Sequence, residues 1–193
     1  MERLLAIWCP AILEEQEQGR EARVFGAMVA ALEGFATRVD PVRPGVCAVP
    51  TRGPSRYFGG DEVLARMAAE AVAGVGAAEA VAGVGVADGL FAAVLAARAA
   101  LGAGPVIVPP GGTPSFLGPW PVATLDRPEL ADLLVRLGVH TLGRFAALPG
   151  PQVLARFGDE GARCQRVARG AEGELPGFRL FFPASVPGRP PRW

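Results

Sequence analysis

The basic residues near the C-terminal end of the chain form a pattern suited to binding a polyanion. Arg163, Arg166 and Arg169 are spaced by three, so a helix would place them near one face. Arg144 and Arg156 lie shortly before them. Arginines on an exposed helix neutralise phosphates without reading bases, so this spacing predicts salt-dependent binding to a nucleic-acid backbone. The alternative is a solvated helix face that binds nothing.

A glycine-containing turn precedes most of these arginines, in the stretch LGVHTLG that begins at Leu137. Apolar residues on both sides predict two short helices joined as a helix-hairpin-helix. In that motif the N–H groups of the turn and of the next helix face an anion. The candidate phosphate-binding residues are Gly138, His140, Thr141 and Gly143. An ordinary helical hairpin turn is the alternative.

Catalysis by the single histidine is poorly supported. His140 has no serine or cysteine partner in a recognisable activating context, so contact with phosphate or solvent is favoured. No serine or cysteine nucleophile is therefore supported, and the sequence predicts no catalytic residue.

The charge distribution supports a polyanion partner better than the composition does. All 19 basic residues are arginine, which reflects base composition as readily as function. Residues 1–126 hold 9 arginines against 13 acids, whereas residues 127–193 hold 10 against 6. A neutral chain therefore hides a basic C-terminal third.

A hairpin in the N-terminal half is a natural place for metal-binding carboxylates, but it carries none. Two β-rich runs, 39–42 and 46–49, flank the turn residues Pro44-Gly45. The residues from Gly45 to Ala48 (GVCA) offer no oxygen ligand for a divalent metal. The acidic pair Asp61-Glu62 starts a helix, where carboxylates suit the macrodipole. We therefore expect no metal site and no metal cofactor.

Two further motifs have competing interpretations. The stretch GVGVADG from Gly83 to Gly89 resembles a dinucleotide fingerprint, but its spacing is one residue too long and no acid follows about 20 positions on. A glycine-rich buried strand packed closely on a helix is favoured, and no cofactor is expected. Arg52 and Arg56 lie with Tyr57-Phe58 in an expected loop after the hairpin. They contact nucleic acid or pair with surface acids, and both interpretations remain open.

The remaining composition favours a cytoplasmic protein without a membrane partner. The three cysteines, Cys9, Cys47 and Cys164, are too far apart for a zinc site or a disulfide frame, so buried thiols are expected. No apolar run of about 18 residues predicts a membrane span. The N-terminus is too short and acidic for a secretory signal.

The elements that position these residues follow from hydrophobic periodicity. In the first part we expect strand 4–9, helix 24–38, the hairpin, a helix capped by Asp61, strand 81–87, helix 90–100 and strand 106–108. The first six match the ferredoxin-like split βαβ pattern, with both helices on one face of the sheet. Later we expect a helix capped by Asp126, a helix 142–148 capped by Thr141, a helix 152–157, and a last one from Asp159 to Gly170.

Several stretches in combination resemble the Y-family translesion DNA polymerases. They are RGPSRYFGG (52–60), FLGPWPVATL (116–125), LLVRLGVHTLGRFAAL (133–148) and RFGDEG (156–161). The resemblance is strongest to the ImuB-like branch, which is usually described as non-catalytic. It implies an α+β fold: a ferredoxin-like palm at 1–108, a linker at 109–128, an all-α helix-hairpin-helix thumb at 129–170, and a Pro/Arg-rich tail at 171–193.

The resemblance also implies a function. Active members place an acid on the first palm strand and an Asp-Glu pair on the hairpin, where this chain has Trp8, Gly45 and Val46. We therefore expect a protein that is not an enzyme and that binds DNA or acts as a scaffold in DNA repair, translesion synthesis and SOS mutagenesis. The expected partners are damaged or primer-template DNA, contacted through its backbone, and polymerases or mutagenesis accessory proteins.

Two departures from the family keep an alternative open. Only residues 11–21 separate the first strand from the first helix, so the fingers module is expected to be missing. The family's further DNA-binding domain and clamp-binding segment are likewise expected to be missing after the Pro/Arg-rich tail. The alternative is a protein-interaction fragment, or a degenerate copy, without affinity for DNA.

Overall fold

The computed structural model describes residues 1–10, 18–75 and 81–171. The chain separates into two units. The first runs from Glu2 to Pro110 and is built on a β-sheet, and the second begins at Gly111 and is helical.

A five-stranded sheet organises the first unit. Its strands are β1 (Arg3–Trp8), β2 (Asp40–Arg43), β3 (Val46–Pro50), β4 (Gly83–Asp88) and β5 (Val106–Ile107). The order is β2-β3-β1-β4-β5, and β1 is antiparallel to both of its neighbours. β2 and β3 form the predicted hairpin, and β5 adds a parallel strand beside β4. This topology confirms the predicted α+β, ferredoxin-like class.

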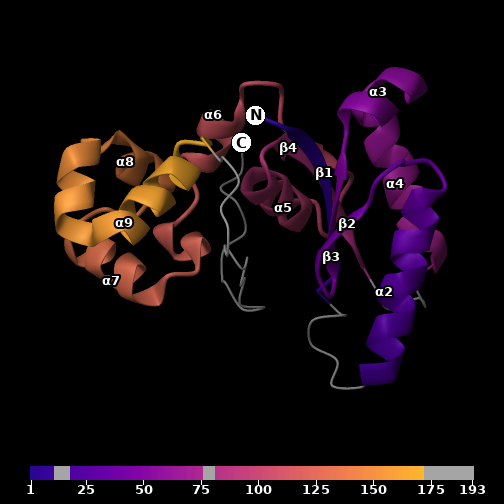
Figure 1. The fold of residues 1–193 in the computed structure, drawn as a ribbon, viewed down its shortest axis with the longest axis horizontal. Helices are drawn as coiled ribbons and strands as arrows, with labels where there is room; N and C mark the ends of the chain where they lie inside the picture. The colour runs from indigo at the N-terminus through magenta and orange to yellow at the C-terminus, as the bar shows by residue number, and fades with distance from the viewer. Residues whose placement is uncertain (11–17, 76–80, 172–193) are drawn as a thin grey trace. The chain divides into compact units, whose positions relative to one another are not determined.

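Helices α2 (Gln18–Glu33) and α4 (Asp61–Val75) cover one face of the sheet, as predicted (Figure 1). Alternate strand residues point to this core, because successive side chains of a strand face opposite ways. The core contains Leu5, Ile7, Met28, Leu32, Val49, Leu64, Ala68, Val72, Val84 and Val86. α2 begins at Gln18, before the predicted Val24. The prediction missed these first turns because their residues are polar and show no apolar periodicity.

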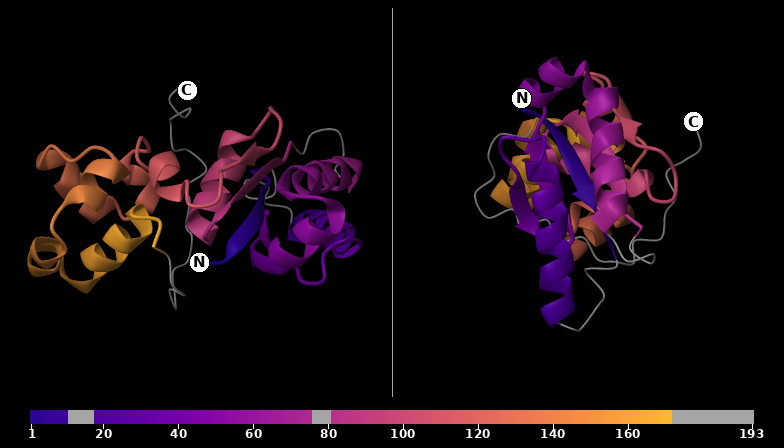
Figure 2. Two further views of the ribbon diagram at one scale, coloured as in Figure 1. Left: turned by 90° about the horizontal axis from the view of Figure 1, so that it is seen from above. Right: turned by 90° about the vertical axis from the view of Figure 1, so that its right-hand side faces the viewer.

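Helix α5 (Leu90–Ala99) covers the opposite face of the sheet (Figures 1 and 2). It crosses β4 so closely that a Cβ on Gly83 would meet the Ala97 carbonyl oxygen, and one on Gly85 would lie 2.1 Å from Ala97 N. Only glycine permits this approach between two backbones. The interpretation of Gly83 to Gly89 as a close-packed strand is therefore confirmed.

Residues 52–58 form helix α3 (Arg52–Phe58), where the sequence predicted a loop. Pro54 lies in its first turn, a position at which proline is tolerated because the N–H that it lacks would have no helical partner. Gly59 ends the helix with a φ of 96°. Gly and Pro were thus misleading loop signals here.

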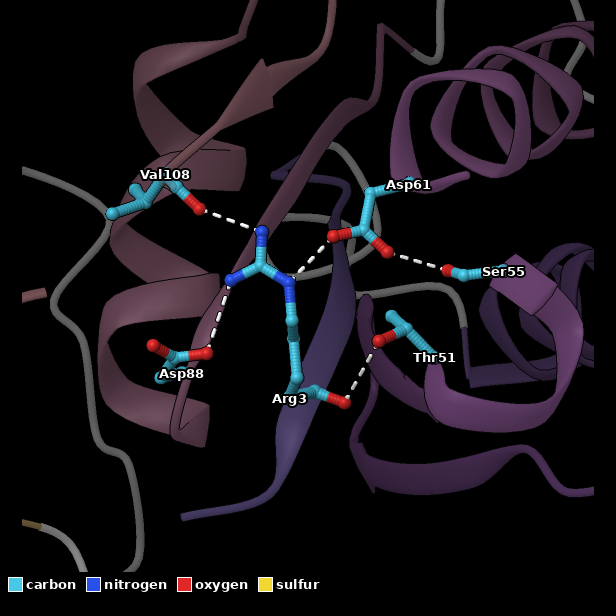
Figure 3. Close-up of polar contacts among 6 residues, drawn as sticks. All are labelled: Arg3, Thr51, Ser55, Asp61, Asp88 and Val108. Carbon is cyan, nitrogen blue, oxygen red and sulfur yellow. Dashed lines mark hydrogen bonds and ion pairs between the residues drawn. The ribbon is translucent and has the colours of Figure 1, made fainter. Parts of the chain in front are cut away.

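Arg3 joins several parts of the first unit (Figure 3). Its Nε donates to Asp61 Oδ2 at 2.5 Å, its Nη1 to Asp88 Oδ1 at 3.0 Å, and its Nη2 to Val108 O at 2.7 Å. Asp61 Oδ1 also accepts from Ser55 Oγ at 2.5 Å. Asp61, predicted as a helix cap, begins α4 and uses its carboxylate to hold β1 and α3 in place.

The second unit is a set of short helices. They are α6 (Thr113–Leu117), the 3-10 turn η1 (Val122–Leu125), α7 (Pro128–Arg136), α8 (Leu142–Ala147) and α9 (Gly150–Ala168). Residues 113–125 are thus largely helical, and Phe116, Leu117, Trp120 and Val122 are buried. Among the described helices none is both long and apolar enough to cross a membrane.

In this unit the predicted break in the last helix agrees with the structure, whereas the predicted cap of α7 does not. Gly158 interrupts α9 with φ 64° and ψ −164°, between the two helices predicted there. Asp126 does not cap α7: it adopts a φ of 54° at the end of η1, and Arg127 precedes the first turn. The predicted tail beyond residue 171 lies outside the described residues.

Candidate nucleic-acid interface

The predicted turn of the helix-hairpin-helix joins α7 to α8. Gly138 has a φ of 78°, and its N–H donates to Val135 O at 2.9 Å. The N–H of Val139 donates to Leu134 O, also at 2.9 Å. This pattern closes the C-terminus of α7 in the manner of a Schellman motif. Neither N–H is therefore directed to a ligand.

The start of α8 uses further N–H groups internally. The side chain of Thr141 caps the helix by accepting from Arg144 N at 3.4 Å, which confirms its predicted role as an N-cap. Gly143 N donates to Gly118 O at 3.0 Å, and a Cβ on Gly143 would meet the same oxygen at 3.0 Å. Gly143 therefore supports close packing of α8 on α6.

Two N–H groups of the turn remain for an anion. Within the described part of the chain, no backbone acceptor is found for the N–H of His140 or of Thr141. The side chain of His140 is exposed. These two residues are the part of the predicted turn that the fold leaves available.

The predicted arginines divide into two groups. Arg144, Arg156, Arg163 and Arg166 are exposed, although Arg144 Nη1 also donates to Gly138 O at 3.4 Å. Arg169 is also exposed, but its Nε donates to Ala146 O at 2.8 Å and its Nη2 to Leu148 O at 2.9 Å. These carbonyls lie at the C-terminal end of α8, where a cation is stabilised by the helix dipole. The guanidinium of Arg169 thus stabilises the fold.

Helix α9 presents Arg163 and Arg166 opposite a buried side. Cys164, Gln165, Val167 and Ala168 are buried. Gln165 Nε2 donates to two carbonyls near the end of α8, at 3.1 and 2.7 Å, and so fixes the rotation of α9. Since the inward side is fixed, Arg163 and Arg166 must face solvent. Arg156 lies before the interruption at Gly158, and its direction does not follow from this periodicity.

At the C-terminal end of β1, two arginines lie against Trp8. The guanidinium carbon of Arg43 is 4.9 Å, and that of Arg98 is 5.2 Å, from the centre of the indole ring, which is buried. This is cation–π geometry. Burial lowers the pKa of Arg98, and the charge of Arg43 lowers it further. The surroundings of Trp8 are therefore strongly positive.

The three positions at which the family resemblance places carboxylates do not fit a divalent metal. Trp8, Gly45 and Val46 are buried and carry no side-chain oxygen for a metal. Two guanidinium groups beside Trp8 would also repel a cation. Among the described residues, no three His, Cys, Asp or Glu side chains gather as a metal site. Asp61 and Asp88 converge, but on the guanidinium of Arg3.

The three cysteines are buried thiols that form no disulfide, as predicted. Burial raises the pKa of Cys47 to about 12, and the nearby Cys9 contributes to the shift. Burial also raises the pKa of Cys164. Because the thiolate is the reactive form, these side chains are suited to packing.

No protein-family model matches this chain, and no curated protein is significantly similar to it. Solved structures do match. DinB from Sulfolobus solfataricus is 17% identical, with a TM-score of 0.66 over 83% of this chain and 47% of its own. A DinB family error-prone DNA polymerase from the same organism is 16% identical, with a TM-score of 0.67 over 83% of this chain and 48% of its own. The protein in an insertion ternary complex of Dbh DNA polymerase is 17% identical, with a TM-score of 0.66 over 83% of this chain and 47% of its own.

The chain therefore shares the fold of these DNA polymerases and spans about half of their length. This supports the Y-family part of the resemblance at the level of fold. Assignment to the ImuB-like branch is not supported and stays a prediction.

The prediction that the chain is not an enzyme is contradicted. The solved structures that share its fold are DNA polymerases. The prediction relied on missing carboxylates at Trp8, Gly45 and Val46. The side chains at these three positions show only that these positions do not hold a metal ion. They are not evidence that the protein catalyses no reaction.

Proposed function

We propose that the second unit binds the sugar-phosphate backbone of DNA. The observation that carries the proposal is the pair Arg163 and Arg166, which the buried side of α9 forces into solvent. Arg144 and Arg156 add positive charge, and the N–H groups of His140 and Thr141 add hydrogen-bond donors for a phosphate oxygen. Gly138, Gly143 and Arg169, which the sequence also predicted as DNA-binding, contribute in this proposal by shaping the turn and α8.

The expected interaction is independent of base sequence. Guanidinium groups neutralise phosphates and release condensed counterions, so the logarithm of affinity should fall linearly with the logarithm of salt concentration. The acids Asp159 and Glu160 also lie on α9, and Glu160 is paired with Arg127 at 2.7 Å. The positive charge is therefore offset in part, and moderate affinity is expected.

Titration of labelled duplex DNA at several salt concentrations tests the proposal. The variant carries Arg163→Glu and Arg166→Glu, and the slope of log affinity against log salt should flatten by about 0.9 for each phosphate that the protein no longer neutralises. Arg66→Glu is the control for each of the single variants Arg163→Glu and Arg166→Glu, because Arg66 is exposed on α4 in the first unit and its substitution reverses one charge in the same way. Circular dichroism confirms that each variant is folded.

The alternative, a protein-interaction fragment without affinity for DNA, predicts no salt-dependent binding in this titration. Equal binding by the Arg163→Glu/Arg166→Glu variant and by the parent would refute the role of α9. Binding weakened equally in the Arg66→Glu control would show that net charge, and not this helix, is responsible.

The biological setting that we propose is DNA synthesis in repair. The support is the fold shared with DinB and Dbh DNA polymerases, one of them described as error-prone. The damaged or primer-template character of the DNA, the SOS context, and polymerase or mutagenesis partners remain predictions. Comparing duplex, primer-template and lesion-containing DNA in the same titration tests the first of these.

A further inference from the structure

Helix α3 presents a surface that the proposed function does not use. At 100° per residue, Arg52, Gly53, Arg56 and Tyr57 fall within an arc of about 140° on its outer side. All four are exposed, and Tyr57, the only tyrosine of the chain, is 83% exposed. We call these four residues the α3 platform. Such high solvent exposure of a large aromatic ring needs an explanation, because burial of the ring would be favourable.

The α3 platform is held rigidly from its inner side. Phe58, which is half-buried, packs edge-on against Phe35 with ring centres 6.4 Å apart, and against Tyr57 at 4.7 Å. Ser55 donates to Asp61, and the N–H groups of Gly59 and Gly60 donate to Ser55 O. The helix lies beside α4 at one end of the first unit (Figure 1). The ring of Tyr57 is therefore positioned and not merely exposed.

The two arginines of the platform keep their charge available. In the described chain neither Arg52 nor Arg56 has a carboxylate within ion-pair distance. The sequence left open whether they pair with surface acids, and the structure shows no such pair among the described residues. Glu62, at the start of α4, is the exposed acid nearest in sequence. The platform therefore combines two cations with one open aromatic face.

We propose that the α3 platform binds single-stranded nucleic acid, with one base stacked on Tyr57 and the flanking phosphates on Arg52 and Arg56. Aromatic rings and arginines in this combination bind unpaired strands without reading sequence. A duplex is disfavoured, since the faces of its bases are already stacked on one another. Tyrosine and arginine are also enriched in protein interfaces, so a protein partner is the competing occupant that the test below separates from nucleic acid.

This inference does not rest on DNA binding by the second unit, so it is tested in the Arg163→Glu/Arg166→Glu background. The probe is a labelled oligodeoxythymidylate of about 12 nucleotides, compared with an abasic oligomer of equal length and with a duplex. We expect the base-containing single strand to bind most tightly. Tyr57→Ala should weaken it at least about fivefold, and Tyr57→Phe should change it less than about twofold, because stacking needs the ring and not the hydroxyl.

Further variants separate stacking from charge and from folding. Tyr57→Leu keeps an apolar contact for Phe58 but removes the ring, and it should bind as weakly as Tyr57→Ala with an unchanged unfolding midpoint. Arg52→Ala/Arg56→Ala should flatten the salt dependence by about 0.7 for each phosphate of the single strand that is no longer neutralised. Three results would overturn the proposal: equal affinity for the abasic oligomer, full binding by both ring-less variants, or binding of a polyglutamate peptide in place of the oligonucleotide.

Discussion

Replacing Gly85 by alanine tests how closely α5 packs on the sheet. The new Cβ would lie 2.1 Å from Ala97 N, 2.5 Å from Ala96 C and 2.6 Å from Ala93 O. All three are backbone atoms of α5, so no side chain can rotate away to make room. Restoring an ordinary contact of 3.4 Å requires α5 or β4 to move by about 1.3 Å.

The size of the effect follows from that movement. A gap of roughly 0.5–1 Å forfeits about a quarter to a half of the dispersion attraction between facing atoms. Every residue from Phe91 to Ala97 is buried, so the gap affects the whole contact between α5 and the sheet. Overpacking costs about 1–3 kcal/mol and more where backbone must shift. Lower entropy of the unfolded alanine chain returns about 0.5–1 kcal/mol. From the upper end of this cost, we expect a net loss of about 2 kcal/mol.

Urea unfolding followed by circular dichroism and tryptophan fluorescence measures this loss. Gly26→Ala is the matched control, because Gly26 is exposed in the middle of α2 and no atom lies within 4 Å of its added Cβ. That variant should be more stable by up to about 1 kcal/mol. Two units can unfold separately, so the transition of the second unit should not change. A Gly85→Ala variant as stable as the parent would refute the close approach.

Three further predictions follow from buried polar groups. Arg3→Met should destabilise the first unit by about 2–4 kcal/mol in urea, because Asp61 and Asp88 lose their shared guanidinium. The contribution of Cys47 to stability should be constant below about pH 9 and fall between pH 9 and about 12, since its thiol ionises in the unfolded chain while burial keeps it protonated when folded. Urea titrations across this range should show a smaller fall in Cys47→Ala. Gln165→Leu should cost about 1–3 kcal/mol in the second unit, since two carbonyls at the end of α8 lose their donor.

Each of these predictions has a clear contrary result. If Arg3→Met unfolds like the parent, the ion pairs at Arg3 are screened by solvent and contribute little. An alkaline fall of equal slope in Cys47→Ala would assign it to Cys164, whose pKa burial also raises, or to another group. A Gln165→Leu variant of unchanged stability would mean that water satisfies the two carbonyls.

The sequence predicted the parts of the fold that depend on local chemistry. Thr141 was recognised as a cap because a threonine before an apolar run has a local partner, the N–H three residues on. The hairpin around Pro44-Gly45 was recognised because a turn and two β-rich runs are contiguous. The break at Gly158 was recognised because the residues on both sides of it form two adjacent helical segments. In each case the deciding residues lie within a few positions of one another.

The features that the sequence analysis missed depend on residues that are far apart in sequence. The acceptors of the Arg3 guanidinium are 58, 85 and 105 residues away in sequence, so no window of sequence contains the site. Helix α3 was missed since its Gly and Pro signals are local, whereas the contacts that hold it come from Phe35 and Asp61. The open ring of Tyr57 and the crowded backbone at Gly85 are likewise consequences of packing.

Arginine shows why the candidate site could be predicted only in part. A spacing of three places Arg163, Arg166 and Arg169 near one another, but it does not say which guanidinium already has acceptors. Arg169 donates to two carbonyls of α8, whereas Arg163 and Arg166 face solvent. Reduced DNA binding in an Arg169 variant would thus be ambiguous, because loss of those bonds changes the fold that presents the other two. Substitutions at Arg163 and Arg166 leave these internal hydrogen bonds intact and so measure contact with phosphate directly.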